Sequence, residues 1–234
     1  LADRALRGMI ATAMALPYEK RVRFMGAVLA RGIGPLIGYR KRAITQLSLI
    51  YPEMTAPQRH QIAQDVCNNF GRTLIENYSF ADLSKRLQNT VAQGAGLDAL
   101  SAAASAGRPV IFVTGHYGNH EVPRHVLTQM GHTIGGLYRP MANPYFNAHY
   151  AKTMTSWGGP VFAQGAKGTI GFARHLARGG MGTLLFDVHN AAGIALPFLG
   201  KPARTSTSAA DLALKCDAVV IPSVATRQAG GVSF

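Results

Sequence analysis

The chain has 234 residues, 47% of them hydrophobic and 15% charged, so it is long and apolar enough to bury a substantial core. These proportions exclude a disordered or fibrous protein. The formal net charge of +13 indicates an anionic partner, such as a membrane face, nucleic acid or an acidic protein.

The first part of the chain, residues 1–90, is predicted to be helical. Residues 1–42 hold nine basic side chains and only two acidic ones, interleaved with apolar runs. This mixture favours a segment that lies in an anionic lipid interface. No apolar run reaches the roughly 18 residues that span a bilayer, and no signal peptide is evident. We expect the sequence to be truncated at both ends.

One long amphipathic helix is predicted within this region. Thr55 is a good N-cap, and Pro57 lies close to the first helical position. Apolar residues then recur at helical spacing, from Ile62 through Val66 and Phe70. The helix is expected to end at about Tyr78.

Beyond Gly94 the sequence alternates between short apolar strands and helices. Strands are predicted at 109–113, 133–138, 182–186 and 218–224, and helices at 119–130, 143–157, 167–178 and 205–215. This alternation predicts an α/β fold with a mixed central sheet covered by helices on both faces. Gly-Gly at 230–231 suggests a closing hairpin. We expect a single domain, with a helical part at 1–90 and an α/β part at 91–234.

The densest chemical signal is the segment Thr114–Glu121, which reads TGHYGNHE where a predicted strand ends and a helix begins. Ligands of open α/β sheets bind at this carboxyl edge. His116 lies in the turn and Glu121 in the first helical turn. The carboxylate can therefore accept a hydrogen bond from one ring nitrogen and leave the other nitrogen basic. Gly115 and Gly118 permit a tight turn and close approach of a substrate.

A stretch without acidic residues follows this motif. From Val122 to Phe186 no Asp or Glu occurs, whereas Arg and Lys recur throughout. We interpret the stretch as part of a groove for a phosphorylated or otherwise anionic substrate.

The spacing of His116 and Glu121 resembles the His-x4-Asp/Glu signature of the glycerolipid and lipid A acyltransferases. The surrounding residues are more similar to the bacterial lipid A lauroyl/myristoyl acyltransferases. Further similarities occur in that family's order along the chain: Arg40–Arg42, Pro52, Tyr138-Arg139-Pro140 followed by Asn143-Pro144, Asp187 at a strand end, and Leu196–Gly200 followed by Thr205. The resemblance covers nearly the whole chain.

This resemblance implies a glycerolipid-acyltransferase-like fold and an acyl transfer that needs no cofactor or metal. A fatty acyl chain would move from an acyl-carrier-protein thioester to a hydroxyl of a lipid A precursor. The His116–Glu121 dyad would act as general base, and Arg139 would hold a phosphate or the developing oxyanion. Asp187 would orient either Arg139 or the histidine.

Three further residues are expected to bind substrate. Arg204 and Thr205 resemble a phosphate-binding helix start, with Thr205 as the N-cap. Asn119 lies within the histidine motif itself. Two positions depart from the family pattern, because Val188 stands where the family usually has Gln and Lys152 where it tends to have Arg. A lysine cannot reproduce the planar fork of an arginine.

The expected partners are an acidic acyl carrier protein as donor and an anionic membrane lipid as acceptor. The expected location is the cytoplasmic face of a bacterial inner membrane, peripheral or with an N-terminal anchor. Nucleic acid is not expected, because no basic helix is interleaved with exposed aromatic residues.

Several alternatives remain at this point. The acceptor could instead be a lysophospholipid, an aminolipid or a glycolipid. Gly118–Glu121 also matches the GNH[D/E] block of binuclear metallophosphoesterases, but the other metal-binding blocks of that class do not occur. A non-enzymatic basic membrane- or nucleic-acid-binding module accounts for the charge but not for the turn at 115–121.

Overall fold

The structure is a computed structural model that describes residues 2–141 and 144–234. Its contacts divide the chain into two compact units, each considered by itself. One unit comprises Leu1–Leu83, Pro197–Pro202 and Ala229–Val232, and the other Ser84–Leu196, Ala203–Gln228 and Ser233–Phe234. The main boundary, after Leu83, lies near the expected change at residue 90. That the chain acts as a single domain stays a prediction.

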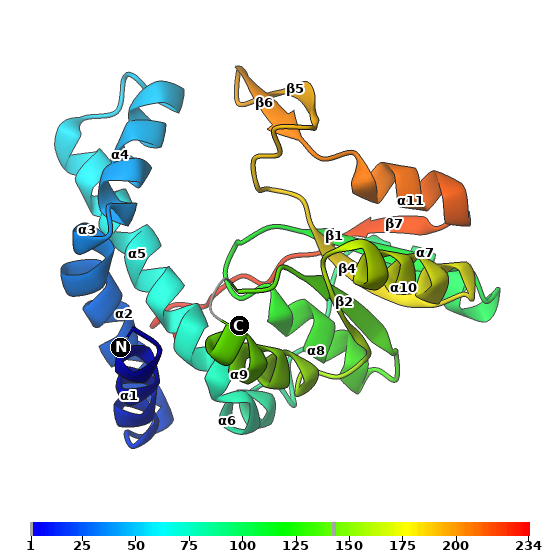
Figure 1. The fold of residues 1–234 in the computed structure, drawn as a ribbon, viewed down its shortest axis with the longest axis horizontal. Coiled ribbons are helices and arrows are strands. Elements are labelled where there is room, and N and C mark those ends of the chain that lie inside the picture. The colour runs from blue at the N-terminus through cyan, green and yellow to red at the C-terminus, as the bar shows by residue number, and fades with distance from the viewer. Residues whose placement is uncertain (1, 142–143) are drawn as a thin grey trace. The chain divides into compact units, whose positions relative to one another are not determined.

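The first unit is built largely from helices (Figure 1). They are α1 (Ala2–Met14), α2 (Tyr18–Val28), a π-helical segment η1 (Leu29–Ile33), α3 (Gly34–Leu36), α4 (Tyr39–Ile50) and α5 (Ala56–Tyr78). The bounds of α5 agree with the prediction. Its start is fixed by Gln58, whose side-chain oxygen accepts hydrogen bonds from the backbone N–H and the hydroxyl of Thr55 at 2.9 and 2.8 Å.

The buried face of α5 differs from the one that apolar spacing indicates. Val66 and Phe70 are 52% and 48% exposed. In this part of the helix the buried stripe lies one position further on, at the small residues Ala63, Cys67 and Gly71, and it continues to Ile75. Small side chains allow α2 to approach closely, since a Cβ added to Gly71 would lie 2.4 Å from the carbonyl oxygen of Met25.

The rest of the chain alternates helices and strands. The elements are α6 (Phe80–Arg86), α7 (Gly96–Ser105), β1 (Val110–Thr114), α8 (Glu121–Gln129), β2 (Ile134–Tyr138), α9 (Pro144–Thr155), β3 (Val161–Ala163), α10 (Ala166–Ala177), β4 (Met181–Leu185), β5 (Ile194–Phe198), β6 (Lys201–Thr205), α11 (Ser208–Cys216) and β7 (Val219–Pro222). Five strands form one sheet in the order β3-β2-β4-β1-β7, with every pairing parallel. β5 and β6 form a separate antiparallel pair.

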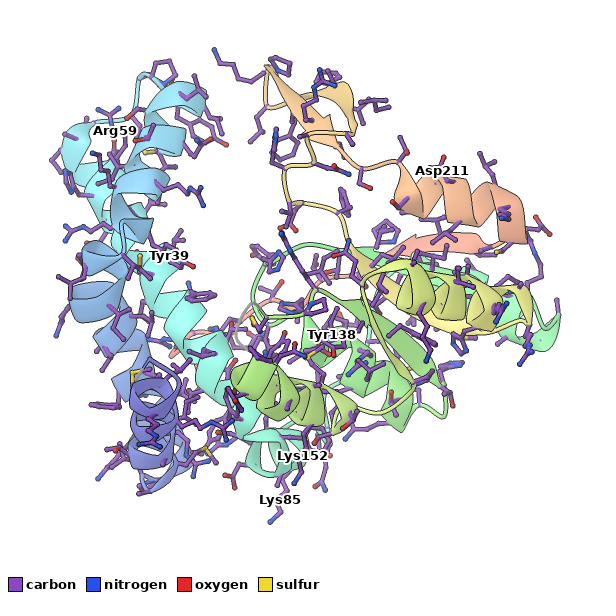
Figure 2. All side chains as sticks on the ribbon, viewed as in Figure 1. Tyr39, Arg59, Lys85, Tyr138, Lys152 and Asp211 are labelled. Atoms are coloured by element: carbon purple, nitrogen blue, oxygen red, sulfur yellow. The ribbon has the colours of Figure 1, made fainter. Side chains whose placement is uncertain are left out.

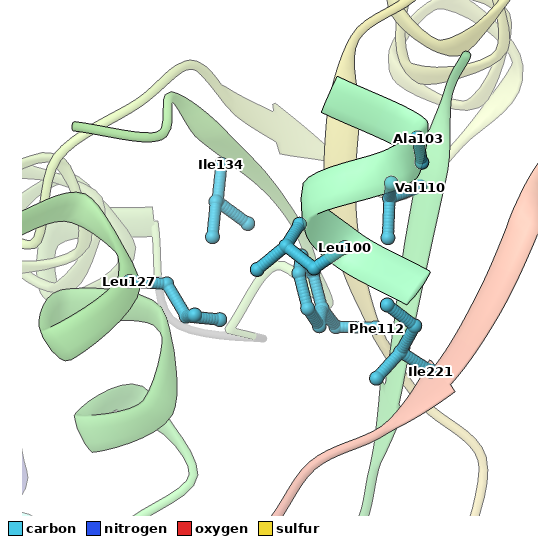
Figure 3. Packing of buried hydrophobic residues seen from close by; sticks show 7 residues of the cluster. All are labelled: Leu100, Ala103, Val110, Phe112, Leu127, Ile134 and Ile221. Atoms are coloured by element: carbon cyan, nitrogen blue, oxygen red, sulfur yellow. The ribbon is translucent and has the colours of Figure 1, made fainter. Parts of the chain in front are cut away.

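Helices cover both faces of the five-stranded sheet, as predicted. Val110 and Phe112 of β1 point to one face, where they pack with Leu100 of α7 and Leu127 of α8 (Figure 3). The intervening Ile111 points to the opposite face, among residues of α10 and α11. The α/β class is thus confirmed, and the antiparallel component lies in the separate hairpin.

Parallel strands bring their carboxyl ends to the same edge of a sheet. β1 leads into the turn that holds His116, β2 leads into Arg139, and β4 leads into Asp187. Three of the predicted site residues therefore follow three neighbouring strands. Asn143, part of the family-like block after β2, lies outside the described residues.

Two details near the C-terminus correct the predictions. The predicted helix at 205–215 begins only at Ser208, because Thr205 is still part of β6 and Thr207 occupies the N-cap position. Residues 230–231 form a turn in which the Gln228 N–H donates to the Ser233 carbonyl at 2.9 Å. No strand follows β7 in the part of the chain that the structure describes, so the closing hairpin does not form there.

Among the described residues, no helix combines the length and apolar character needed to cross a membrane.

Candidate active site

The side chain of His116 is held by Asp187. The ring nitrogen Nδ1 lies 2.9 Å from Asp187 Oδ1, and the backbone N–H of His116 donates to Oδ2 at 2.7 Å. A carboxylate only accepts, so in the neutral ring the proton is on Nδ1 and Nε2 is the nitrogen with a free lone pair. The His116 side chain is 54% exposed, so the ring is accessible from solvent.

The register of two adjacent strands explains this contact. Thr114 at the end of β1 is paired with Leu185 at the end of β4. The Phe186 N–H still donates to the Thr114 carbonyl at 3.2 Å, which continues the ladder beyond the strands. His116 follows Thr114 by two residues and Asp187 follows Leu185 by two residues, so the two side chains lie next to each other.

Two glycines allow the turn to take this shape. A Cβ added to Gly115 would lie 2.9 Å from Asp187 Oδ2, so a side chain here would displace the carboxylate. Gly118 has a φ of 58°, and a Cβ on it would lie 2.2 Å from the Ala225 carbonyl oxygen. The glycines permit a tight turn, as predicted, and the groups that approach them here are Asp187 and the Ala225 carbonyl. Close approach of a substrate stays a prediction.

The charge of Asp187 is stabilised where it lies. Partial burial alone would raise its pKa, but the hydrogen bonds from the ring and backbone of His116 outweigh that effect and lower the pKa below its usual value. Asp187 therefore stays ionised at neutral pH. An ionised carboxylate on Nδ1 favours the imidazolium that forms when Nε2 accepts a proton.

Glu121 does not hold the His116 ring, which corrects the predicted hydrogen bond between them. The side chain of Glu121 is 6% exposed, and its Oε2 lies 2.9 Å from Nε of Arg124, one helical turn along α8. Neither atom forms a hydrogen bond of good geometry, so the contact is an ion pair between two buried charges. The carboxyl group that the motif supplies is engaged within α8.

Arg124 connects several elements behind the turn. It is 2% exposed, and its Nη2 donates to the carbonyl of Met154 in α9 at 2.8 Å. A Cβ added to Gly136 of β2 would lie 2.8 Å from Nη1, so the guanidinium lies against the strand that ends next to Arg139. Burying an arginine is costly unless its charge is compensated, and Glu121 provides that compensation.

Two other side chains near this ion pair have shifted pKa values. Burial, reinforced by the charge of Glu121, raises the pKa of Tyr150 to about 12. Burial lowers the pKa of His120, more than the nearby carboxylates of Glu121 and Asp187 raise it. Both groups are therefore neutral at pH 7. The His120 ring meets the His116 ring edge-on, with centroids 5.2 Å apart.

The residues predicted to bind substrate lie in different settings. Arg139 is exposed directly after β2, and no described residue forms a hydrogen bond or ion pair with it. Asn119 is fully buried, and its side-chain oxygen accepts a hydrogen bond from the backbone N–H of Glu121 at 3.1 Å. Asn119 thus binds the first backbone N–H of α8, and its buried side chain is not accessible to a ligand in this arrangement.

Arg204 and Thr205 do not form the start of a helix, which corrects the expected phosphate-binding cap. Both belong to β6, the second strand of the hairpin. Arg204 Nη1 donates to the Gly193 carbonyl at 2.9 Å, and the Thr205 hydroxyl donates to the Ala203 carbonyl at 3.2 Å. The structure brings together His116 and Asp187, but it places these two residues on a different element.

Comparison with known proteins identifies the family of the chain. Residues 5–234 match the family described as bacterial lipid A biosynthesis acyltransferase. The chain belongs to this family. It is 25% identical over 214 residues to the lipid A biosynthesis acyltransferase of Haemophilus influenzae, which covers 88% of this chain and 65% of that protein. The chain thus spans a little less than two thirds of the curated relative that it matches.

Membership of the lipid A acyltransferase family decides against the metallophosphoesterase alternative. Asn119 and His120 would bind metal in that class, but the Asn119 side chain is buried and its oxygen accepts a hydrogen bond from the backbone N–H of Glu121. The two departures from the family-like pattern both lie on the surface. Val188, directly after Asp187, is 53% exposed. Lys152 lies exposed on α9 (Figure 2).

The buried positions of Arg124 and Tyr150 behind the turn were not predicted from the sequence. Arg124 stands three residues after Glu121, a spacing that on most helices marks a solvated ion pair. Its burial follows from α9 and β2 closing over it, which no local pattern reveals. The strand-end position of Asp187, in contrast, could be recognised in the sequence. Asp187 was expected to orient either Arg139 or His116, and it contacts His116.

Proposed function

We propose that the chain transfers a fatty acyl group from a thioester to a hydroxyl of a lipid A precursor, with His116 as general base. The observation that carries the proposal is the hydrogen bond that Nδ1 of His116 donates to Asp187, which leaves Nε2 as the other nitrogen of a half-exposed ring at the carboxyl edge of the sheet. Family membership supplies the reaction class. The whole relative is longer than this chain, so the activity itself has to be measured.

The proposed reaction proceeds by direct transfer. His116 Nε2 takes the proton of the acceptor hydroxyl while its oxygen attacks the thioester carbonyl carbon. The tetrahedral intermediate then collapses with cleavage of the carbon–sulfur bond. The imidazolium returns its proton to the leaving thiolate. Because the acceptor oxygen attacks the thioester directly, no covalent acyl-enzyme is formed. Asp187 keeps the ring oriented and stabilises its charged form.

Arg139 is proposed to bind the anionic part of the reaction. It follows β2 at the same sheet edge as His116 and Asp187, and it is exposed with no described partner. A guanidinium can clamp a phosphate or stabilise an oxyanion through two parallel hydrogen bonds. The acid-free segment from Val122 to Phe186 leaves that charge uncancelled by nearby sequence.

An acyl carrier protein is the proposed donor. Such carriers are acidic, and the chain has a formal net charge of +13. The charge alone does not distinguish a carrier from coenzyme A, so both thioesters belong in the assay.

The first unit is proposed to rest on the cytoplasmic face of the inner membrane. Leu36 at the end of α3 and Ile37 directly after it are 86% and 54% exposed. They are flanked by Arg31 on one side and by the basic run Arg40–Arg42 on the other. Exposed apolar groups within a basic surface favour an anionic lipid interface.

The proposal is tested by incubating purified chain with lauroyl or myristoyl carrier protein, or the matching coenzyme A ester, and four acceptors. These are a lipid A precursor, a lysophospholipid, an aminolipid and a mannosylated inositol lipid. Mass spectrometry should find one added acyl chain on the lipid A precursor. Acylation of another acceptor alone would change the assigned substrate. No acylation of any of the four acceptors by folded wild-type protein would contradict the proposal.

A further inference from the structure

The hairpin of β5 and β6 carries an exposed apolar surface that the proposed chemistry does not use. Its first strand, Ile194–Phe198, is exposed at every position. Six large apolar side chains in this part of the chain are 43–62% exposed: Phe186, Val188, Ile194, Leu196, Phe198 and Leu199. A two-stranded sheet is marginally stable in water unless it packs against something, and such apolar surfaces mark interaction sites.

The apolar side chains of β5 lie on one face of the hairpin, and one basic residue borders that face. Because side chains of a strand alternate, Ile194, Leu196 and Phe198 share a face of β5. The two strands are joined by the two residues Leu199–Gly200, which sets Phe198 opposite Lys201 at the start of β6. Directly opposite residues point to the same side, so Lys201 borders the apolar face.

The turn at the tip holds a leucine where the backbone favours glycine or asparagine. Leu199 and Gly200 have φ values of 49° and 74°, which is the left-handed backbone that a type I′ turn needs at both central positions. This conformation is unfavourable for a residue with a large side chain. Leu199 is 51% exposed, so it gains little packing within the chain to offset that strain. An apolar side chain kept at this position indicates an apolar contact outside the chain.

The charge of the hairpin indicates what that contact is. No acidic residue occurs from Val188 to Ala210, whereas Lys201 and Arg204 both lie on β6. Lysine and arginine side chains can lie along apolar surface while their charged ends reach the phosphates of a lipid interface. An apolar tip with basic flanks and no acids is suited to an anionic bilayer surface.

We propose that the β5–β6 hairpin inserts its tip, Phe198 and Leu199, into the surface of an anionic membrane. Asp187, which holds the candidate base, precedes Leu199 at the tip by twelve positions. Such a segment spans at most roughly 43 Å. A membrane-bound tip would therefore tether the candidate base to the lipid interface within about that distance. This inference rests on one part of the proposed function, namely that the acceptor is a lipid.

Flotation of the full chain with vesicles of phosphatidylcholine and phosphatidylglycerol, without donor or acceptor, tests the proposal. Leu199→Asn removes the apolar group but keeps a residue that the turn favours, and Phe198→Ser removes the second apolar group. Each should lower the partition coefficient about tenfold, the loss expected for one buried large apolar side chain. Leu214→Asn, the same substitution at an 85% exposed position of α11, is the matched control and should leave it unchanged.

Two measurements keep the result independent of folding. Leu199→Asn should unfold at a temperature equal to or above that of the wild type, because it relieves the strained turn. A polarity-sensitive fluorophore on Leu199→Cys, with Cys216→Ser to remove the accessible thiol, should shift to shorter wavelength on vesicles. No shift, or wild-type partitioning of both tip variants, would overturn the proposal.

Binding of the tip to a partner other than a membrane would give different results in these assays. Tip-dependent self-association in the absence of vesicles, with vesicle binding unchanged in the variants, would assign the surface to a second copy and overturn the proposal. Tip-dependent binding of acyl carrier protein with unchanged vesicle binding would overturn it in the same way. The flotation assay involves no acyl transfer, so its failure leaves the test of the proposed function intact.

Discussion

Asp187 accepts two hydrogen bonds from His116, from the ring at 2.9 Å and from the backbone N–H at 2.7 Å. Glu121, the acidic residue of the same motif, instead forms a buried ion pair with Arg124. One carboxylate therefore orients the candidate base, and the other compensates a buried charge behind it. Substitutions at the two positions should impair the protein in different ways.

Asp187→Asn should reduce kcat on the order of 10²-fold while the fold persists. An amide can donate to Nδ1 as well as accept from it, so it no longer selects the tautomer with a basic Nε2. Steady-state acyl transfer and thermal unfolding of the same preparation measure the two effects. Near wild-type turnover would show that Asp187 has no part in orienting His116.

Glu121→Gln should destabilise the fold by about 3–5 kcal/mol, because it leaves the charge of Arg124 buried without a partner. Urea unfolding measures the loss. The double substitution Glu121→Gln with Arg124→Met removes both charges, so it should be more stable than Glu121→Gln alone. A single variant as stable as the wild type would mean that the ion pair contributes nothing to folding.

Much of the fold follows from the sequence because local patterns determine it. The apolar runs at β1 and β4 predict buried strands, and Thr55 with Pro57 fixes the start of α5. His116 is identified by its place at a strand end between two glycines. The parallel order of the strands then gathers Arg139 and Asp187 at the same edge without any further assumption.

The remaining features depend on contacts between distant residues. The pairing of His116 with Asp187 follows from the register of β1 against β4, which no spacing along the chain encodes. The His-x4-Glu spacing suggested Glu121 as the partner because it is the nearest acid in sequence. Thr205 resembled a helix cap, but β6 continues through it and the helix begins three residues later, at Ser208.

Arg139→Ala should reduce kcat/KM by about 2–4 kcal/mol in transition-state free energy, and Arg139→Lys should not restore the loss. The reason is that a lysine offers a point charge and no planar fork. Both variants should unfold within about 0.5 kcal/mol of the wild type, because Arg139 is exposed and unpaired among the described residues. Equal activity of all three proteins would remove Arg139 from the site.

The pH dependence of stability should report the lowered pKa of Asp187. Folding favours the ionised carboxylate, so its contribution is present above the ordinary value of 3.8 and is lost as the pH falls through the lower folded value. The difference in unfolding free energy between wild type and Asp187→Asn should therefore shrink only below about pH 4. Urea unfolding across acidic pH measures it. A difference that already disappears near neutral pH would contradict the assigned direction.

His116→Ala tests the central claim most directly. Acyl transfer by this variant should be measured under the conditions in which wild-type protein acylates its best acceptor, together with thermal unfolding. The account predicts a rate lower by about 10²–10⁴-fold, the usual contribution of a general base, in a protein that still unfolds cooperatively because the ring is 54% exposed. A folded His116→Ala protein that transfers acyl chains at nearly the wild-type rate would contradict the account.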